Sequence, residues 1–336
     1  MRFIIHDFIL NYGMNQNSKY GITCYFAAVK DIMTYHNTNS VTITESEIYL
    51  LLNGSNIKYC ENTNFFGYDF EDPENLILLN DHLKYISGHE KNIVEIIEEY
   101  IKKGNPLICF VESNYLQYHP IFSESNNDVH AIILYGIDQI KDKCYVLDSH
   151  IRIDPYKTET FIGEYSLSNI LRGLQCLWVL KNLETNISWN KIIELIEERI
   201  AIYLNQQDKE ADSFYGNKAL GEYIKKQSEL MEISEVNVWE QKSQILSYDL
   251  KFKASCQMIE YLVDINEKVK GLLTPYIPDL ILLKEDWYRV SNLLLLASYQ
   301  SNSSRLSLAL QRANDLVKKE RYIFNKVLKG ISISYL

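Results

Sequence analysis

Residues 18–28 read SKYGITCYFAA and place Cys24 where a polar, glycine-containing turn gives way to an apolar helix. Free cysteine behaves as a small hydrophobe, so a buried structural thiol is the ordinary interpretation of this residue taken alone. A catalytic thiolate is the alternative, because a cysteine in the first turn of a helix meets unpaired backbone N–H groups and the positive end of the helix dipole. The rest of the chain decides between the two.

The composition is that of a globular protein with room for two hydrophobic cores. The chain has 336 residues, of which 46% are hydrophobic and 23% charged, and we therefore expect two domains. Its 44 acidic side chains exceed its 34 basic ones, which gives a formal net charge of -10. This balance disfavours nucleic acid and anionic membranes as partners.

Targeting signals and cofactor motifs are not found in the sequence. No apolar run approaches the roughly 20 residues of a membrane span, and the first residues, MRFIIHDFILNYG, lack the pattern of a secretory signal. We therefore expect a cytoplasmic protein with reduced thiols. The six cysteines form no CxxC pair and no His/Cys ligand cluster, and no Gly-rich phosphate loop occurs, so neither a metal site nor a cofactor is expected. These cysteines are Cys24, Cys60, Cys109, Cys144, Cys176 and Cys256.

The chain changes character near residue 185. Before that point, four β-rich runs separated by turn-like stretches predict strands of one antiparallel sheet, at 106–113, 130–138, 143–149 and 175–182. After it, helical periodicity dominates, with Ser188, Ser213 and Ser234 as predicted N-caps. We therefore predict a catalytic domain over 1–182 and a helical bundle over 183–336 that covers or flanks the active-site cleft.

Three helices are predicted in the first half. The first spans 24–36, and the second, at 43–54, starts with Thr44 as cap and Glu47 at capping-box distance. The third, at 92–103, ends at Gly104. Helices combined with an antiparallel sheet predict the α+β fold class, with the first helix packed on the sheet and an all-helical domain following it.

A histidine and an aspartate stand where they can complete a cysteine-based site. His130 begins the strand HAIILYGID, and Asp148 closes the next strand, YVLDSH, after the short connection DQIKDK. If these strands form an antiparallel hairpin, the Asp148 carboxylate can accept a ring N–H of His130 and orient the imidazole. An imidazole at a strand start can in turn face a helix N-terminus across a cleft. Together, these contexts favour catalysis over the structural interpretation of Cys24.

On these motifs the chain resembles the papain-like cysteine-enzyme superfamily. More narrowly, ITCYFAAVKDIMTYH, the helix ending in an NG turn, HAIILYGID and YVLD resemble the butirosin-biosynthesis acyltransferase family and the related papain-fold amide synthetase type of closthioamide assembly. The resemblance covers about residues 1–182 and implies a papain-like fold. It implies Cys24 as nucleophile, His130 as base and Asp148 as the residue that orients the base.

The resemblance also implies an oxyanion donor upstream of the nucleophile. Papain-like peptidases commonly have a glutamine six residues before the cysteine, and this chain has Ser18 there. Gln16 and Asn17 are the nearest side-chain amides and are our candidates, with the Cys24 backbone N–H as second donor. This departure counts against a conventional peptidase.

Each of the other site residues has a structural interpretation as well. His130 alone would be an ordinary strand-edge histidine, and Asp148 could cap the turn through DSH. His150 is the alternative imidazole, which we rank below His130 because the hydrophobic strand after His130 fits the fold better.

The resemblance implies an acyl transfer that forms an amide. The acyl group would come from a peptidyl or acyl carrier protein thioester, pass through Cys24, and reach a small amine such as 1,3-diaminopropane, as in nonribosomal antibiotic biosynthesis. For the amine we consider Glu222, Asp249, Glu260 and Asp286, and for the carrier the basic residues Lys318, Lys319, Arg321, Lys326 and Lys329. Two other functions remain open, a papain-like cysteine peptidase or thioester hydrolase and a noncatalytic binding module.

Overall fold

A computed structural model of the chain describes residues 2–9, 23–36, 43–68, 83–123, 129–154, 157–180, 187–205, 212–253 and 255–334. The chain divides into two compact units, one made of 1–48 with 78–186 and the other of 49–77 with 187–336. Helix α3 (Glu45–Leu51) runs across the boundary between them. Residues 49–77 therefore belong with the C-terminal half of the chain, whereas the sequence grouped them with the N-terminal half.

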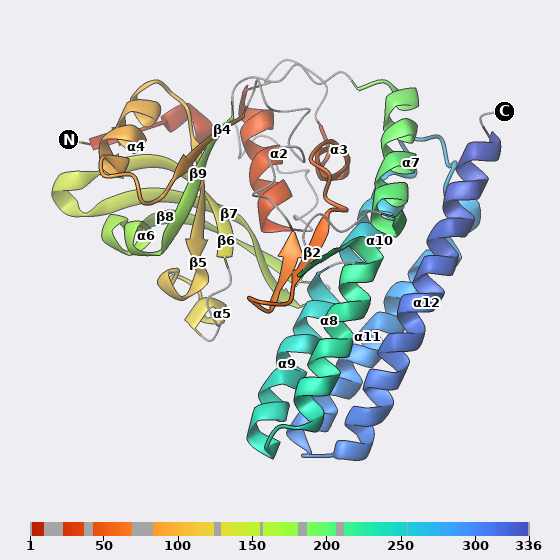
Figure 1. Ribbon diagram of the computed structural model, residues 1–336. Coiled ribbons are helices and arrows are strands. Elements are labelled where there is room, and N and C mark those ends of the chain that lie inside the picture. The colour runs from red at the N-terminus through yellow and green to blue at the C-terminus, as the bar shows by residue number, and fades with distance from the viewer. Residues whose placement is uncertain are drawn as a thin grey trace. The chain divides into compact units, whose positions relative to one another are not determined.

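The first unit is built on an antiparallel sheet. Its strands follow the order β4-β9-β5-β6-β7-β8, with β1 paired to β6 (Figure 1). The strands are β1 (Arg2–Ile4), β4 (Leu83–Ser87), β5 (Leu107–Glu112), β6 (Val129–Asp138), β7 (Lys143–Asp154), β8 (Lys157–Ser166) and β9 (Leu174–Leu180). The four strands that the sequence predicted are β5, β6, β7 and β9, and the mixed helix and antiparallel-sheet architecture is confirmed.

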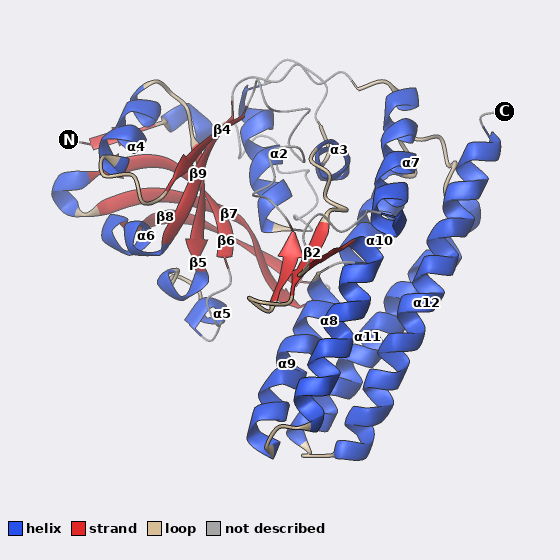
Figure 2. Cartoon of the chain, in the orientation of Figure 1, coloured by secondary structure: helices blue, strands red, loops and turns tan. Residues whose placement is uncertain are grey.

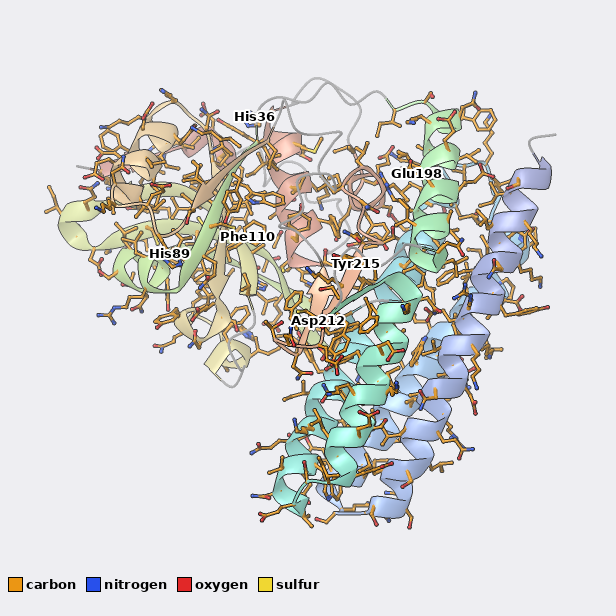
Figure 3. The ribbon with its side chains drawn as sticks, in the orientation of Figure 1. His36, His89, Phe110, Glu198, Asp212 and Tyr215 are labelled. Atoms are coloured by element: carbon orange, nitrogen blue, oxygen red, sulfur yellow. The ribbon has the colours of Figure 1, made fainter. Side chains whose placement is uncertain are left out.

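Helices cover this sheet on both sides, which explains the continuous apolar runs in its central strands. Helix α2 (Cys24–His36) packs against β6, β7 and β9, and α4 (Ile93–Lys102) lies across the sheet from it (Figure 1). Phe26, Val29 and Ile32 of α2 are fully buried. On β5, Phe110, labelled in Figure 3, lies 5.7 Å from the ring of Tyr25. Strands buried on both faces need no alternation of polar residues.

Local sequence signals set the ends of several helices as predicted. The Thr44 N–H and the Glu47 N–H are satisfied reciprocally by the side chains of Glu47 and Thr44, at 2.7 and 3.3 Å, which confirms the capping box. Gly104 has φ +77 after the end of α4, as a helix-terminating glycine does. Short helices fill the other connections of the first unit, namely η2 (Ser113–Tyr115), α5 (Pro120–Ser123), η3 (Gln139–Lys141) and α6 (Leu167–Gly173).

The second unit is mainly helical, with four long helices side by side (Figure 1). Its helices are α7 (Trp189–Asn205), α8 (Gly216–Glu232), α9 (Val236–Phe252), α10 (Ser255–Ile265), η4 (Thr274–Tyr276), α11 (Ile277–Tyr299) and α12 (Ser303–Ser334). The four that lie side by side are α8, α9, α11 and α12, of which α8 and α9 have 17 residues each, as α7 does, and α11 and α12 have 23 and 32. Ser188 caps α7 through a bond from the Lys191 N–H, as predicted. No helix in the described part of the chain combines the length and the apolar character that crossing a membrane requires.

The expectation of a purely helical second half is wrong in one place. Strand β10 (Ser213–Tyr215) pairs with β2 (Ile57–Cys60), which pairs with β3 (Phe65–Tyr68), so that a small red sheet lies among the blue helices of this unit in Figure 2. Asp212, just before this strand, and Tyr215, its last residue, are labelled in Figure 3.

Two predicted helix caps are also wrong. Ser213 is a strand residue, and α8 begins only at Gly216, whose φ of +57 and whose close approach to the Tyr203 carbonyl leave no space for a Cβ atom. Ser234 turns its hydroxyl back to the Leu230 carbonyl, and α9 begins after Glu235 without a side-chain cap. At Ser213, strand pairing overrides the capping signal, and at Ser234 the hydrogen bond from the hydroxyl to the Leu230 carbonyl does so.

A buried carboxyl group joins five helices of the second unit. Glu320 of α12 is fully buried and accepts hydrogen bonds from Asn217 Nδ2 and Trp287 Nε1, each at 3.0 Å. The hydroxyls of Tyr203 and Ser255 also donate to it. All four donors are uncharged, so burial dominates and raises the pKa of Glu320 above its ordinary value.

We expect the stability of the protein to fall as pH rises because of Glu320. The folded state holds this proton in a pH range where the unfolded chain has lost it, so the stabilisation is complete below the ordinary glutamate pKa and is lost as pH rises through the raised one. Above the ordinary glutamate pKa, the wild-type free energy of unfolding should fall with rising pH more steeply than that of Glu320→Gln, by at most roughly 1.4 kcal/mol per pH unit.

Guanidinium titrations of the two proteins at a series of pH values measure this difference. The exposed Glu267→Gln, in the same unit, should keep the wild-type slope. An equal pH dependence of the free energy of unfolding in wild type and Glu320→Gln would contradict a raised pKa at Glu320.

Candidate active site

Cys24 is the first residue of α2, and neighbouring side chains fix the start of that helix. Thr23 Oγ1 accepts a hydrogen bond from the Phe26 N–H at 3.3 Å, which makes Thr23 the N-cap. The Thr23 N–H donates to Glu45 Oε1 at 2.9 Å. The half-buried Cys24 thiol therefore lies beside backbone N–H groups that have no acceptor within the helix. This is a position that stabilises negative charge on sulfur.

His130 and Asp148 meet across neighbouring strands. His130 is on β6 and Asp148 on β7, which pair as an antiparallel hairpin. His130 Nε2 lies 2.8 Å from Asp148 Oδ2, and the His130 side chain is 12% exposed. The other oxygen, Oδ1, accepts the His150 N–H at 3.1 Å, and Asp148 itself is fully buried. The carboxylate is thus held from both sides and orients the imidazole.

The imidazole also reaches the cysteine. The Cys24 side chain lies close enough to the imidazole to contribute, by its charge and by hydrogen bonding, to the raised pKa of His130. Because Nε2 faces Asp148, Nδ1 is the ring nitrogen left to face the sulfur. The structure therefore brings the three residues selected from the sequence into one line of contacts, from sulfur to imidazole to carboxylate.

The charges in this line stabilise one another. Burial has the largest single effect and lowers the pKa of His130, but the negative charges of Asp148 and Cys24 and the hydrogen bonding to both residues together outweigh it and raise the pKa to about 10. Burial raises the pKa of Asp148, but the His130 charge and the hydrogen bonds to the carboxylate bring it below its ordinary value. The site accordingly holds an imidazolium next to a carboxylate at neutral pH. An imidazolium beside a cysteine favours the thiolate, which is the nucleophilic form.

Two aromatic residues that we did not select from the sequence complete the site. Tyr118 donates its hydroxyl to Asp148 Oδ2 at 2.7 Å, and the ring of Phe122 lies 4.7 Å from that of His130. Both belong to the segment between β5 and β6, which contains η2 and α5. The sequence signal was the three aromatic residues in NYLQYHPIF shortly before His130, but nothing in that pattern says which way the rings turn.

The remaining candidates have different outcomes. Gln16 and Asn17, our oxyanion candidates, lie outside the described residues, as does Ser18. The Cys24 backbone N–H is at the start of α2, as the second donor requires. His150 joins the site through its backbone N–H to Asp148, while the imidazole in contact with the carboxylate is that of His130.

The acidic residues considered for an amine already have cationic partners. Asp249, Glu260 and Asp286 form ion pairs at 2.8, 3.4 and 2.7 Å. Their respective partners are Lys253, Lys284 and Lys319. Glu222 contacts Lys225 and lines a hollow of about 390 Å³ within the second unit that also contains Lys218 and Arg321. Two cations at that hollow do not suit a positively charged amine.

Comparison with known proteins agrees with this geometry at the level of the superfamily. A model of the Peptidase_C39 like family matches residues 11–169, a range that includes Cys24, His130 and Asp148. A search of curated proteins finds no match. The similarity supports a papain-like, cysteine-dependent enzyme, the broader of the two resemblances seen in the sequence.

The contact between His130 and Cys24 should control how fast the thiol reacts. We expect His130→Ala to slow alkylation of Cys24 by iodoacetamide at neutral pH by about tenfold or more, because the cation that favours the thiolate is gone. The rate is measured by mass spectrometry of the Cys24 peptide after timed quenching.

Cys60, a half-exposed thiol in the second unit, is followed in the same digests as internal control and should react at an unchanged rate. An unchanged rate at Cys24 would mean that the imidazole does not act on the sulfur.

Proposed function

We propose that this protein is an amide-forming acyltransferase that carries its acyl group on Cys24. The main support is the continuous line of contacts from Cys24 through His130 to Asp148, which supplies a nucleophile, a proton carrier and a group that orients the carrier. The narrower resemblance to the butirosin-biosynthesis acyltransferases, seen in the sequence around all three residues, favours transfer over peptide hydrolysis.

The first half of the proposed reaction moves the acyl group to the protein. The Cys24 thiolate attacks the carbonyl carbon of an acyl thioester, and the developing oxyanion is stabilised by the Cys24 backbone N–H. The carbon–sulfur bond of the donor then breaks. The departing thiolate takes the proton from the His130 imidazolium, which leaves a neutral imidazole and a thioester on Cys24. One thioester replaces another, so this step is close to thermoneutral.

The second half uses the neutral imidazole as a base. A neutral amine attacks the acyl carbon, and His130 takes the proton that the nitrogen loses as the amide forms. The bond to Cys24 breaks and restores the thiolate beside an imidazolium. Asp148 stays ionised throughout and stabilises the imidazolium each time it forms.

The donor we propose is a carrier-protein thioester. Because the whole chain is acidic, docking of an acidic carrier would need a local basic patch. Near the C-terminus, Lys319 and Lys326 are each engaged with an aspartate of α11, at 2.7 and 2.8 Å. Lys318, Arg321 and Lys329 are exposed on α12 and are our candidates for the carrier contact.

A thioester that needs no carrier tests the chemistry directly. With 4-hydroxybenzoyl-pantetheine as donor, we expect an acyl adduct on Cys24 by intact mass and peptide mapping, because the thiolate is the nucleophile. Adding 1,3-diaminopropane should remove the adduct and yield the amide. Cys24→Ala should give neither product.

The outcome of the same assay separates the three functions considered. Release of free acid at an equal rate with and without amine would contradict the transferase and indicate a hydrolase. An absence of any adduct on the wild-type protein across a panel of aliphatic and aromatic acyl donors would contradict covalent catalysis altogether.

The carrier contact is tested by charge reversal. We expect Lys318→Glu combined with Lys329→Glu to raise the KM for acyl-carrier several-fold, because favourable charge pairs at the rim of an interface become unfavourable ones. The KM for the pantetheine thioester should not change.

Lys141→Glu combined with Lys91→Glu makes the same change in net charge on exposed residues of the first unit and is the control. An equal KM for acyl-carrier in both double variants would exclude the α12 patch.

A further inference from the structure

One oxygen of Asp148 accepts two hydrogen bonds from side chains. His130 Nε2 lies 2.8 Å and Tyr118 Oη 2.7 Å from Oδ2. The same negative charge is therefore shared by the catalytic imidazole and by a phenol that comes from a different segment of the chain. A hydrogen bond to a buried charged group is among the strongest in proteins.

The surrounding residues fix Tyr118 in this position. Its ring stacks on Phe161 of β8 at 4.3 Å and meets the ring edge of Tyr165 at 5.2 Å. The Tyr165 hydroxyl donates to the Tyr115 carbonyl at 2.7 Å and accepts the Gln117 N–H at 2.8 Å. The backbone before Tyr118 is thus tied to β8, and its hydroxyl is directed at Asp148.

The Tyr118 hydroxyl stays a donor over the working range of the protein. Burial, and after it the charge of Asp148, raise the pKa of Tyr118 well above its ordinary value. The phenol therefore keeps its proton wherever the Cys24–His130 pair is functional. Tyr118 contributes to the site as a fixed dipole and takes no part in proton transfer.

We propose that Tyr118 is a positioning residue that divides the charge of Asp148 Oδ2 between two hydrogen-bond donors. His130 then releases its proton more readily than it would if the carboxylate oxygen bonded to His130 alone. The hydroxyl also prevents the carboxylate from rotating, because the His150 N–H holds the opposite oxygen. Tyr118 acts only through Asp148 and needs no contact with substrate.

This role rests on the proposed function, because the proposed acyl transfer requires the His130 imidazole both to release and to accept a proton. His130 must give its proton to a departing thiol and take one from an amine in every cycle. A carboxylate bonded to His130 alone would hold the imidazolium proton more tightly and slow its release. Because Tyr118 shares the charge of Asp148, the free energies of proton release from His130 and of proton uptake by His130 are closer to each other.

The ionisable groups near His130 come from four elements. The two in direct contact with the ring, Cys24 of α2 and Asp148 of β7, both raise its pKa. The groups one contact further away are Tyr118, His119, His150, Glu159 and Tyr165. Of these, His119 and Glu159 form a pair of their own at 3.2 Å. Tyr118 is the one that bonds to the same carboxylate oxygen as His130.

We expect Tyr118→Phe to raise the titration midpoint of His130. Without the phenol, the whole charge of Oδ2 acts on the imidazolium, and the midpoint should rise by about one pH unit, the size expected for a charged hydrogen bond. The midpoint is read by NMR of protein labelled at histidine Cε1, with the His130 signal assigned from its loss in His130→Asn. Asp148→Asn should move the midpoint in the opposite direction and shows the full size of the carboxylate effect.

Two further proteins separate this role from a structural one. Tyr145→Phe removes a tyrosine hydroxyl from the same sheet whose partners are Tyr135, Arg2 and Glu164, so it should leave the midpoint unchanged. Replacement of Tyr118 by 3-fluorotyrosine keeps the shape of the side chain and makes the phenol a stronger donor, so it should lower the midpoint. This variant also serves if Tyr118→Phe does not fold.

The result that overturns the proposal is an unchanged midpoint in both Tyr118 variants, or an equal rise in Tyr145→Phe. The titration uses no acyl donor or amine, so its outcome is independent of the transferase assay. A shifted midpoint in a protein that transfers no acyl group would keep the role of Tyr118 and remove the proposed function.

Discussion

The buried carboxylate of Asp148 is the constraint on which the site depends. A charge with no exposure to water is costly unless it is paired and hydrogen-bonded, and Asp148 meets this need with one cation and two further donors. Those partners come from β6, β7 and the segment after β5. The ionised state of Asp148 therefore requires three parts of the first unit to be correctly placed around it. The orientation of His130 toward Cys24 follows from the same requirement.

The second unit contains a buried carboxyl group in the opposite state. Glu320 is as deeply buried as Asp148 and accepts four hydrogen bonds to the three of Asp148, yet its pKa is raised while that of Asp148 is lowered. The difference lies in the charge of the partners. Asp148 faces an imidazolium, whereas the donors around Glu320 are a phenol, a hydroxyl, an amide and an indole. Hydrogen bonds from neutral groups do not offset burial here, and a neighbouring positive charge does.

The sheet and its hairpin were predictable because their signals are local. Apolar runs bounded by turn residues indicated β5, β6, β7 and β9, and the short connection DQIKDK indicated that β6 and β7 pair. The pairing of those two strands brings His130 to Asp148. The capping box of Thr44 and Glu47 was predictable for the same reason, since both partners lie within one helical turn. The cap at Ser213 was not, because pairing with the distant strand β2 decides the conformation of that residue.

The sequence by itself determined the order of cysteine, histidine and aspartate and the elements that carry them, and it indicated the broad class of papain-like cysteine enzymes. It also pointed to a mainly helical second half. Only the tertiary structure decided that Tyr118 and Phe122 turn toward Asp148 and His130 and that residues 49–68 belong to the same compact unit as the C-terminal helices. The physical reason is the range of the interactions. Periodicity, capping and turn chemistry act within a few residues, whereas the direction of a ring on a connecting segment is set by packing against strands far away in the chain.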